Sequence, residues 1–366
     1  MTTVDPVLDL PFNAQPDPEE FITAAMRWHF SPETGSPFWL ERAKALAFDP
    51  VADVRSFADL SRFPNVANEL RDARADDLIP RGYGPRPGVV GVYESGGTTG
   101  PPKRVVLLQD WLDKLLDWTG AQLDAHGVPQ GVNWLLAVPS GPHMVGDIIA
   151  RQAVFRGGLP FRIDLDPRWV KRRIGEGKAA DAADYGEHIV DQLAHHLQTQ
   201  DVGVLLTTPP TLERLVQRDD LLKLVQEKVK AIYWLGTQMD ADSRHLYRTS
   251  IFPDIVLYGG LGSTMILGNA TERLGLSDDD PCIYDPFSPY MTFQVVDPDK
   301  PTEPVPYGER GQVIMHHVSK AVLMPNNLER DQATRFEPPE GAVGDSVADI
   351  TPLPTFDDQA VVEGVY

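Results

Sequence analysis

A short run of small and hydroxylated residues with one lysine has the composition of an anion-binding loop. It reads Ser95, Gly96, Gly97, Thr98, Thr99, Gly100, Pro101, Pro102 and Lys103. Glycines permit positive φ angles and let backbone N–H groups approach an anion closely. The two threonine hydroxyls add hydrogen-bond donors, and Lys103 adds a positive charge. The loop is therefore predicted to hold a triphosphate.

The segments on either side of this loop are predicted to position it between a strand and a helix. Residues 89–93 have the composition of a buried strand, and residues 109–125 place four leucines on one helical stripe. The spacing differs from the Gly-x4-Gly-Lys-Ser/Thr pattern of a Walker loop and from the Gly-x-Gly-x-x-Gly dinucleotide turn. Both of those nucleotide sites are therefore excluded.

Residues 95–103 resemble the phosphate loop of the adenylate-forming superfamily, which includes acyl-CoA synthetases, peptide-synthetase adenylation domains and luciferases. A flexible surface turn is the alternative, but it does not account for nine matching positions in order. The resemblance implies that the ligand is ATP, that Mg²⁺ is held mainly through the ATP phosphates, and that a carboxylic acid is adenylated.

Composition limits the class of partner. The 366 residues carry a net charge of −20, which disfavours nucleic acid and anionic membranes as main partners. No apolar run reaches membrane-spanning length, and the N-terminus lacks the basic start of a signal peptide. The single cysteine, Cys282, rules out an internal disulfide and a multi-cysteine zinc site. We expect a cytoplasmic globular protein that binds small molecules.

Beyond the loop, strands alternating with helices predict a layered α/β fold with parallel strands and flanking helices, as in the N-terminal domain of the adenylate-forming fold. Predicted strands lie at 134–139, 161–165, 202–207, 230–235 and 254–258. Predicted helices lie at 18–30, 185–199, 211–218 and 240–249, and a further helix follows the turn at 140–146 and runs to about residue 155. Because ligands bind at the carboxyl ends of parallel strands, the loops after these strands are the candidate site.

Three segments after these strands resemble family segments that contact substrate. His143 to Gly146 resembles a His-x-x-Gly segment beside the acyl pocket, and the other eight histidines are predicted to be structural or superficial. Residues 234–238 resemble a segment along the adenine and acyl pockets, which implies roles for Trp234, Gly236 and Thr237. Residues 308–315 resemble the hairpin before the ribose-binding aspartate. That aspartate is predicted to be Asp331, with Asp345 as the alternative.

Residues 258–265 resemble the family's Tyr-Gly-x-Thr-Glu segment in two possible alignments. Matching Gly262-Ser263-Thr264 to Gly-x-Thr puts Leu261 at the adenine-stacking tyrosine and Met265 at the magnesium-binding glutamate, whereas matching Tyr258-Gly259 requires an insertion. In both, the carboxylate is missing, and a thioether is a poor ligand for Mg²⁺. No metal ligand is therefore predicted. The resemblance implies catalytic roles for Lys103, Thr264 and His143. It implies that the nucleotide is contacted by residues 95–100, Gly236, Thr237, Tyr258, Gly259, Gly262, Ser263 and Asp331. It also implies that the acyl pocket is formed by His143, Gly146, Trp234, Gly260, Leu261 and Met265.

Residues 1–366 are predicted to form one AMP-binding domain, with 1–88 as a helical approach segment like that of phenylacetate-CoA-ligase-like members and 350–366 as the start of a hinge. The family's mobile C-terminal domain is expected to be absent. The resemblance implies activation of an aminobenzoate-like or hydroxyanthranilate-like acid as its acyl adenylate. Transfer to a small nucleophile would give an ester or amide in a natural-product pathway. The alternatives are an aryl-CoA ligase and a non-catalytic nucleotide or acyl-adenylate binding protein. The protein partner also stays open: it could be a second copy of this chain in a homodimer, a separate downstream enzyme, or a separate chain that supplies the missing domain.

Replacing Lys103 with alanine is expected to weaken ATP use with little loss of stability. A loop lysine without a core role contributes little to folding, whereas a lost charge-assisted hydrogen bond typically costs about tenfold or more in affinity. Pyrophosphate release and the thermal unfolding midpoint, measured on the variant and the parent protein, check the two parts of this expectation. Unchanged kinetics would show that the loop has been misassigned.

Overall fold

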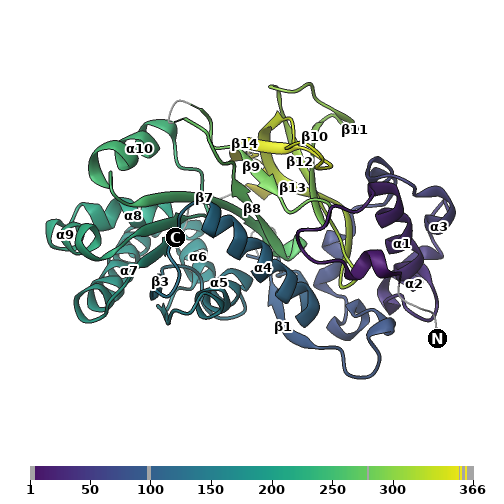
Figure 1. Ribbon diagram of the computed structural model, residues 1–366, viewed down its shortest axis with the longest axis horizontal. Coiled ribbons are helices and arrows are strands. Elements are labelled where there is room, and N and C mark those ends of the chain that lie inside the picture. Colours follow the sequence, from purple (N-terminus) through teal and green to yellow (C-terminus); the bar gives the residue numbers. More distant parts are fainter. Residues whose placement is uncertain (1–4, 97–99, 278–279, 354, 357–358, 361–366) are drawn as a thin grey trace.

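A large mixed sheet forms the centre of the molecule. The computed structural model describes residues 5–96, 100–277, 280–353, 355–356 and 359–360. Within them, twelve strands form one sheet in the order β11-β10-β12-β13-β14-β9-β8-β7-β6-β5-β3-β4. Helices α7 to α9 lie at one end of the molecule and α1 to α3 at the other (Figure 1). The predicted α/β class is confirmed.

One half of the sheet is parallel, as the alternation of strands and helices predicts. The strands β4, β3, β5, β6 and the first part of β7 pair in parallel. They span Trp134–Leu136 (β3), Pro160–Arg162 (β4), Val204–Thr207 (β5), Ala231–Trp234 (β6) and Val256–Ser263 (β7). The connecting helices are α4 (Gln109–Ala125), α5 (Met144–Phe155), α6 (Pro167–Gly175), α7 (Ala179–Thr199), α8 (Pro209–Val216), α9 (Asp219–Lys228) and α10 (Ala241–Leu246). Of the described helices, none combines the length and the apolar character needed to cross a membrane.

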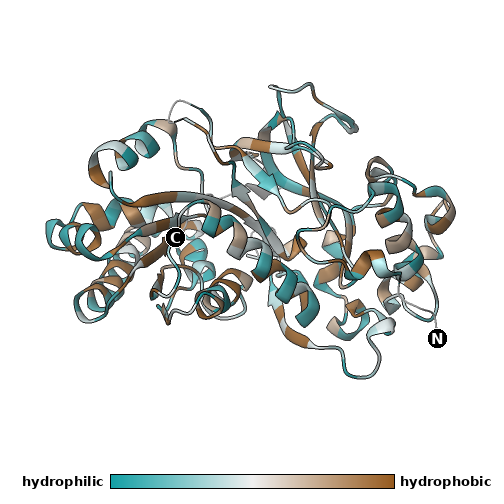
Figure 2. Ribbon diagram, viewed as in Figure 1, coloured by the Kyte–Doolittle hydropathy of each residue, from teal (hydrophilic) through white to brown (hydrophobic). Residues whose placement is uncertain are grey.

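Successive residues of these parallel strands pack in different parts of the core. Leu206 and Tyr233 belong to a cluster with Leu123 of α4 and Ile149 of α5. Their neighbours Leu205, Ile232 and Trp234 belong to a larger cluster with Leu193, Leu212 and Val225 from α7, α8 and α9. This is the alternation expected when side chains point to opposite faces of a sheet. Apolar residues accordingly concentrate on the strands and on the inner sides of the helices (Figure 2).

The other half of the sheet is antiparallel, and most of it was not predicted. It contains β8 (Gly268–Glu272), β9 (Tyr284–Pro286), β10 (Met291–Asp297), β11 (Lys300–Pro304), β12 (Arg310–Val318), β13 (Leu323–Phe336) and β14 (Ser346–Pro352). These strands are joined by antiparallel pairing, which needs no helical crossover. The strand expected after Gly308 is present as β12. A separate hairpin pairs β15 (Thr355–Phe356) with β16 (Gln359–Ala360).

The predicted phosphate loop connects two strands, so the prediction of a strand-to-helix loop is wrong. β1 (Val89–Glu94) pairs antiparallel with β2 (Arg104–Leu108), and α4 begins directly after β2. The prediction that β1 is a buried strand is also wrong, because Tyr93 is the one buried residue among its six. A two-stranded ribbon outside the main sheet leaves five of the six residues of the first strand exposed or half-buried. The run of valines in β1 reflects β propensity rather than burial.

The N-terminal approach segment contains α1 (Pro18–Phe30), α2 (Pro37–Ala43) and α3 (Pro50–Asp53), with shorter turns at Pro6–Asp9, Phe57–Arg62, Ala67–Arg71, Ala75–Leu78 and Arg81–Tyr83. The side chain of Asp17 caps α1 by accepting hydrogen bonds from the N–H groups of Glu19 and Glu20. Two indoles fix the segment to the turn between β12 and β13. Trp28 Nε1 donates to the Lys320 carbonyl at 2.8 Å, and Trp39 Nε1 to the Leu323 carbonyl at 2.8 Å.

Three buried histidines are expected to make the protein less stable in acid. Burial lowers the pKa of His29 and His316 to about 4 and that of His317 to about 3. The unfolded chain, with histidine pKa values of about 6.5, takes up protons first, so this stabilisation is complete above about pH 6.5 and is lost as the pH falls toward 4. The thermal unfolding midpoint should therefore decrease between about pH 7 and 5.

The control for this pH dependence is His188, which is exposed. His188→Asn should leave the slope unchanged, whereas His29→Gln should reduce it. A flat profile in the parent protein would contradict the assignment.

Candidate active site

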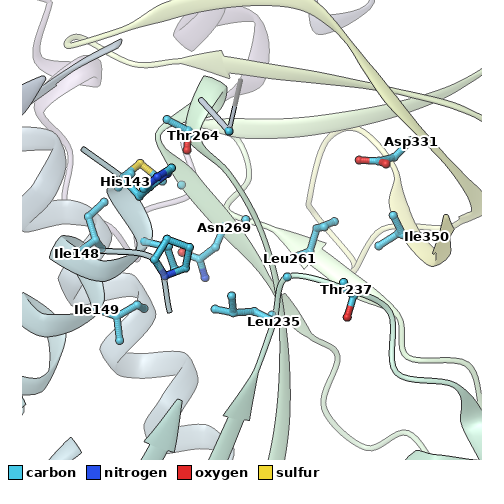
Figure 3. Close-up of a pocket in the computed structure, with 18 of the residues that line it drawn as sticks. His143, Ile148, Ile149, Leu235, Thr237, Leu261, Thr264, Asn269, Asp331 and Ile350 are labelled. Carbon is cyan, nitrogen blue, oxygen red and sulfur yellow. The ribbon is translucent and has the colours of Figure 1, made fainter. Parts of the chain in front are cut away.

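Among the described residues, two adjoining cavities open at the carboxyl ends of the parallel strands. The first, here called the deep cavity, has a volume of about 270 Å³ and lies between α5 and the ends of β6 and β7 (Figure 3). The second, here called the loop cavity, has a volume of about 200 Å³ and lies between the phosphate loop, β7 and β13. The residues that line both are Gly96, Lys171, Leu261, Gly262, Thr264, Arg330 and Asp331.

The deep cavity is lined by apolar and polar side chains. Ile148 and Ile149 lie on one side of it and Leu235 near its middle, whereas Thr237 and Asp331 lie on the other side together with Ile350 (Figure 3). Two polar atoms in its wall, Thr237 Oγ1 and Asn269 Nδ2, are buried and have no hydrogen-bond partner among the described residues. An unsatisfied buried polar group costs about 1–3 kcal/mol. Both atoms are therefore suited to bind a polar group of a ligand.

His143 lines the deep cavity at the start of α5 and is 9% exposed. Burial, and then the positive charge of Arg168, lower its pKa to about 4, so its ring is neutral near pH 7. Gly146 lines a neighbouring cavity of about 290 Å³ instead of the deep cavity. A Cβ at this position would lie 2.4 Å from the Pro139 carbonyl oxygen. The absence of a side chain at Gly146 thus allows α5 to approach the end of β3.

On β6 the residue that faces the deep cavity is Tyr233, not the predicted Trp234. Trp234 is 1% exposed and belongs to the larger core cluster. The physical reason is that adjacent strand residues point to opposite faces, so only one of the two can reach the cavity. Gly236 and Thr237, beyond the end of the strand, line the cavity as expected.

The cavity lining favours one of the two alignments of residues 258–265. Gly260, Leu261, Gly262 and Thr264 line the deep cavity, as expected from the alignment on 262–264. Tyr258 instead lies in the core, fully buried, with its ring 4.8 Å from that of Tyr233.

Gly259 is likewise part of the structural core of β7. Its N–H donates to Glu272 Oε2 at 2.8 Å. Tyr258 and Gly259 therefore pack in the core and do not line the cavity, contrary to the predicted nucleotide contacts. Both residues lie before the part of β7 that reaches the cavity.

A carboxylate from another strand lies beside the loop in which the expected glutamate is missing. Met265 lines the loop cavity rather than the deep cavity. Glu329 of β13 lines the same cavity, and its Oε1 accepts hydrogen bonds from Ser263 Oγ at 3.0 Å and from Asn327 Nδ2 at 2.8 Å. No cluster of three or more acidic, histidine or cysteine side chains is found in the part of the chain that the structure describes. A single carboxylate is compatible with Mg²⁺, which is commonly bound by one or two carboxylates together with substrate phosphates.

The base of the phosphate loop is closed by its own backbone. Ser95 N donates to the Lys103 carbonyl at 2.9 Å, and Lys103 N donates to Ser95 Oγ at 3.0 Å. Gly96 lines both cavities and Lys103 lines the loop cavity. The predicted phosphate ligands Gly97, Thr98 and Thr99 lie outside the described residues, and Gly100 follows them.

Cationic side chains that the sequence pattern did not reveal gather around this loop. Arg71 lines the loop cavity, and its Nε donates to the Pro101 carbonyl at 3.1 Å. Arg168 donates to Glu94 Oε2 at 2.8 Å and to the Ser95 carbonyl at 2.9 Å. These residues come from segments that precede and follow the loop, without any motif spacing. Only their positions in the fold identify them.

The position of Asp331 fits a ligand-binding role better than that of its alternative. Asp331 lines both cavities. Asp345 is 3% exposed, pairs with Arg335 at 2.9 Å and accepts a hydrogen bond from Val295 N at 3.0 Å, so it has a structural role. Within the expected hinge at 350–366, Ile350 and Pro352 line the deep cavity. Much of that segment lies outside the described residues.

Comparison with solved structures identifies the fold. The open conformation of 2-hydroxyisobutyryl-CoA ligase, in complex with 2-HIB-AMP and CoA, matches with a TM-score of 0.64 and 14% identity, over 92% of this chain and 74% of that one. The same ligase in the postadenylation state with R3-HIB-AMP gives 0.64 and 14%, over 95% and 70%. An anthranilate CoA ligase in complex with anthranoyl-AMP gives 0.50 and 12%, over 71% and 47%. No protein-family model and no curated protein matches the sequence. The chain has the fold of the adenylate-forming enzymes.

Replacing Arg71 with alanine is expected to weaken polyphosphate binding at the loop cavity. Removing a charged donor next to a bound anion should reduce the affinity for inorganic tripolyphosphate by about tenfold or more. Calorimetric titration measures this directly. Arg74→Ala is the matched control, because Arg74 has a side chain that is 77% exposed. Equal affinities of the two variants would show that Arg71 does not contact the anion.

Proposed function

We propose that this chain catalyses the ATP-dependent conversion of a small carboxylic acid into its acyl adenylate. The observation that carries the proposal is the meeting of the two cavities. A largely apolar cavity that suits an organic acid adjoins a cavity bounded by Arg71, Lys103 and the glycine-rich loop. The shared lining is where a carboxylate and a phosphate group would come together. Positioning of this kind accounts for a large part of catalysis in phosphoryl transfer.

The proposed arrangement assigns each part of the nucleotide to a wall. The β- and γ-phosphates would occupy the loop cavity, near Lys103 and Arg71. Asp331 would accept hydrogen bonds from ribose hydroxyls, and Thr237 would donate to the nucleoside. The organic part of the acid would lie in the deep cavity beside the neutral ring of His143. Thr264, which lines both cavities, would contact the groups at their junction.

We propose Glu329 as the residue that would hold Mg²⁺ against the ATP phosphates. Its oxygen ligands suit a hard cation, in contrast to the thioether of Met265. When bound, Mg²⁺ supplies positive charge that neutralises the phosphates. Ser263 and Asn327 would orient the carboxylate through the hydrogen bonds that they donate to Oε1. This role for hydrogen-bonded neighbours is general among metal-binding carboxylates.

In the proposed step, a carboxylate oxygen attacks the α-phosphorus and forms a new O–P bond. The bond from the α-phosphorus to the oxygen that bridges it to the β-phosphorus breaks, and pyrophosphate leaves with the electron pair. No proton is transferred. Negative charge moves from the carboxylate toward the α-phosphoryl oxygens and pyrophosphate. The cations that line the loop cavity stabilise this charge.

The substrate we propose is an aryl acid with a polar ring substituent, such as an aminobenzoate or a hydroxyanthranilate. Apolar walls from Ile148, Ile149 and Leu235 and the ring of Tyr233 suit a flat hydrocarbon surface. The buried amide of Asn269 would bind the substituent. The anthranoyl-AMP bound to the similar anthranilate CoA ligase is the adenylate of an acid of this class.

The activated acyl group would then be transferred to a small nucleophile. A hydroxyl or amine would attack the acyl carbon, AMP would leave with the electrons of the C–O bond, and the proton of the nucleophile would pass to water. An ester or amide of a natural-product pathway would result. CoA as the acceptor is the alternative, and product analysis with each nucleophile distinguishes the two.

Carboxylate-dependent exchange of pyrophosphate into ATP tests the proposed reaction. Exchange should occur with benzoate-type acids and be absent without an acid. Asp331→Asn should lower exchange and ATP affinity but leave tripolyphosphate affinity unchanged, because tripolyphosphate has no ribose. Lack of exchange with a broad panel of acids, despite tight ATP binding, would contradict catalysis and support a binding protein. A preference for long-chain fatty acids would contradict the aryl substrate.

A further inference from the structure

Helix α6 places a lysine at the junction of the two cavities. The side chain of Asp166 caps the helix by accepting hydrogen bonds from Arg168 N at 3.0 Å and Trp169 N at 3.1 Å. Arg168 and Lys171 are three residues apart and therefore lie on the same face of the helix. Arg168 is bonded to Glu94 and to the Ser95 carbonyl. The start of α6 is thus fixed to the phosphate loop, and Lys171 lines both cavities.

A second cation approaches the same point from the sheet. Arg330 of β13 lines both cavities, and its Nη1 is buried without a hydrogen-bond partner among the described residues. Its Nε lies 4.0 Å from Asp331 Oδ1. Burial, followed by the positive charges of Arg330 and Arg168, lowers the pKa of Lys171 to about 8. Like charges that face one another in a partly buried site destabilise each other, and an anion between them offsets this cost.

We propose that Lys171 and Arg330 form an anion clamp that holds the reacting α-phosphoryl group, and that Lys171 is a catalytic residue of adenylation. The proposal rests on the function proposed above. It places a resident lysine where the carboxylate meets the α-phosphorus. During the attack, charge spreads over the α-phosphoryl oxygens, so a cation at this point stabilises the transition state more than the bound substrates.

The location of Lys171 distinguishes it from the other cations of the site. Arg71 and Lys103 line the loop cavity, so they are suited to the β- and γ-phosphates. Arg168 is engaged with Glu94 and the loop backbone. Lys171 and Arg330 are the described cations that line both cavities. Lys171 and Arg330 are therefore suited to the α-phosphate, which lies between the acid and the β- and γ-phosphates.

The first test measures AMP binding by calorimetry, because AMP carries the α-phosphate without the other two and its binding does not require turnover. Lys171→Met and Arg330→Met should each weaken AMP affinity by about tenfold or more. Arg172→Ala is the matched control on the same helix, because Arg172 has a side chain that is 66% exposed. Unchanged AMP affinity in folded Lys171→Met protein would overturn the clamp.

The second test measures acid-dependent pyrophosphate exchange. Lys171→Met should reduce kcat by about 100-fold, the usual effect of losing one charged group at a developing oxyanion. Lys171→Arg should recover part of the rate because it keeps the charge, and Arg172→Ala should match the parent protein. A kcat of Lys171→Met equal to that of the parent would overturn the catalytic role. Parent protein that binds AMP through Lys171 but shows no exchange would support the clamp and contradict the proposed function.

The pH dependence of the exchange reaction distinguishes a catalytic role of the positive charge on Lys171 from a purely structural role of its side chain. The charged or titratable groups that line the same cavities as Lys171, or shift its pKa, are Arg71, Lys103, His143, Arg168, Tyr233, Tyr284, Glu329, Arg330 and Asp331. Lys171, whose pKa is lowered to about 8, loses its charge as the pH rises. The kcat/KM for ATP in the exchange reaction, which reports the ionisation of the free protein, should therefore fall above about pH 8, and this fall should be absent in Lys171→Arg, since a guanidinium stays protonated. An identical alkaline limb in both proteins would overturn the assignment.

Discussion

The candidate site depends on a change of strand pairing within β7. Gly259 is still paired in parallel with Trp234 of β6, whereas the next residue, Gly260, is paired antiparallel with Thr271 of β8. Side chains from β6 occupy the space in front of both glycines. An added Cβ would lie 2.8 Å from the Trp234 ring at Gly259 and 2.3 Å from Tyr233 Oη at Gly260. The two glycines thus allow the strand to change partners and leave room for Tyr233 in the cavity wall.

The residues that follow this change of pairing serve both cavities. Leu261, Gly262 and Thr264 line the deep cavity on one side and the loop cavity on the other. β13 and α6 approach the same place from different parts of the fold and contribute Arg330, Asp331 and Lys171. An organic acid and a polyphosphate can therefore lie end to end across a short stretch of backbone. The sheet supplies the rigidity that a reaction between two bound substrates needs.

The charge around the loop cavity is opposite in sign to the net charge of the whole chain. The protein has a net charge of −20, yet four cationic residues line the loop cavity: Arg71, Lys103, Lys171 and Arg330. Because the interaction of charges falls with distance and is screened by salt, this local cluster can bind an anion on an acidic protein. The deep cavity shares Lys171 and Arg330 with the loop cavity, but Arg71 and Lys103 line the loop cavity alone, and the histidine of the deep cavity is neutral. Positive charge is therefore more concentrated in the loop cavity.

Local patterns in the sequence determined several helices and the parallel strands, and they predicted an anion-binding loop. Both α1 and α4 span the predicted ranges, 18–30 and 109–125, because apolar periodicity is a signal that acts within a few turns. The composition of 95–103 indicated an anion site for the same reason. The family resemblance also singled out Asp331, which lines both cavities. The tertiary structure decided the features that depend on residues far apart in the chain. It placed a hairpin where a strand-to-helix loop was predicted, and it placed Tyr233 instead of Trp234 at the cavity. It also brought four residues to the site that no pattern had indicated: Arg71, Lys171, Glu329 and Arg330. No periodicity or motif connects these residues, since their proximity arises from pairing and packing of the sheet, which a pattern along the chain does not encode.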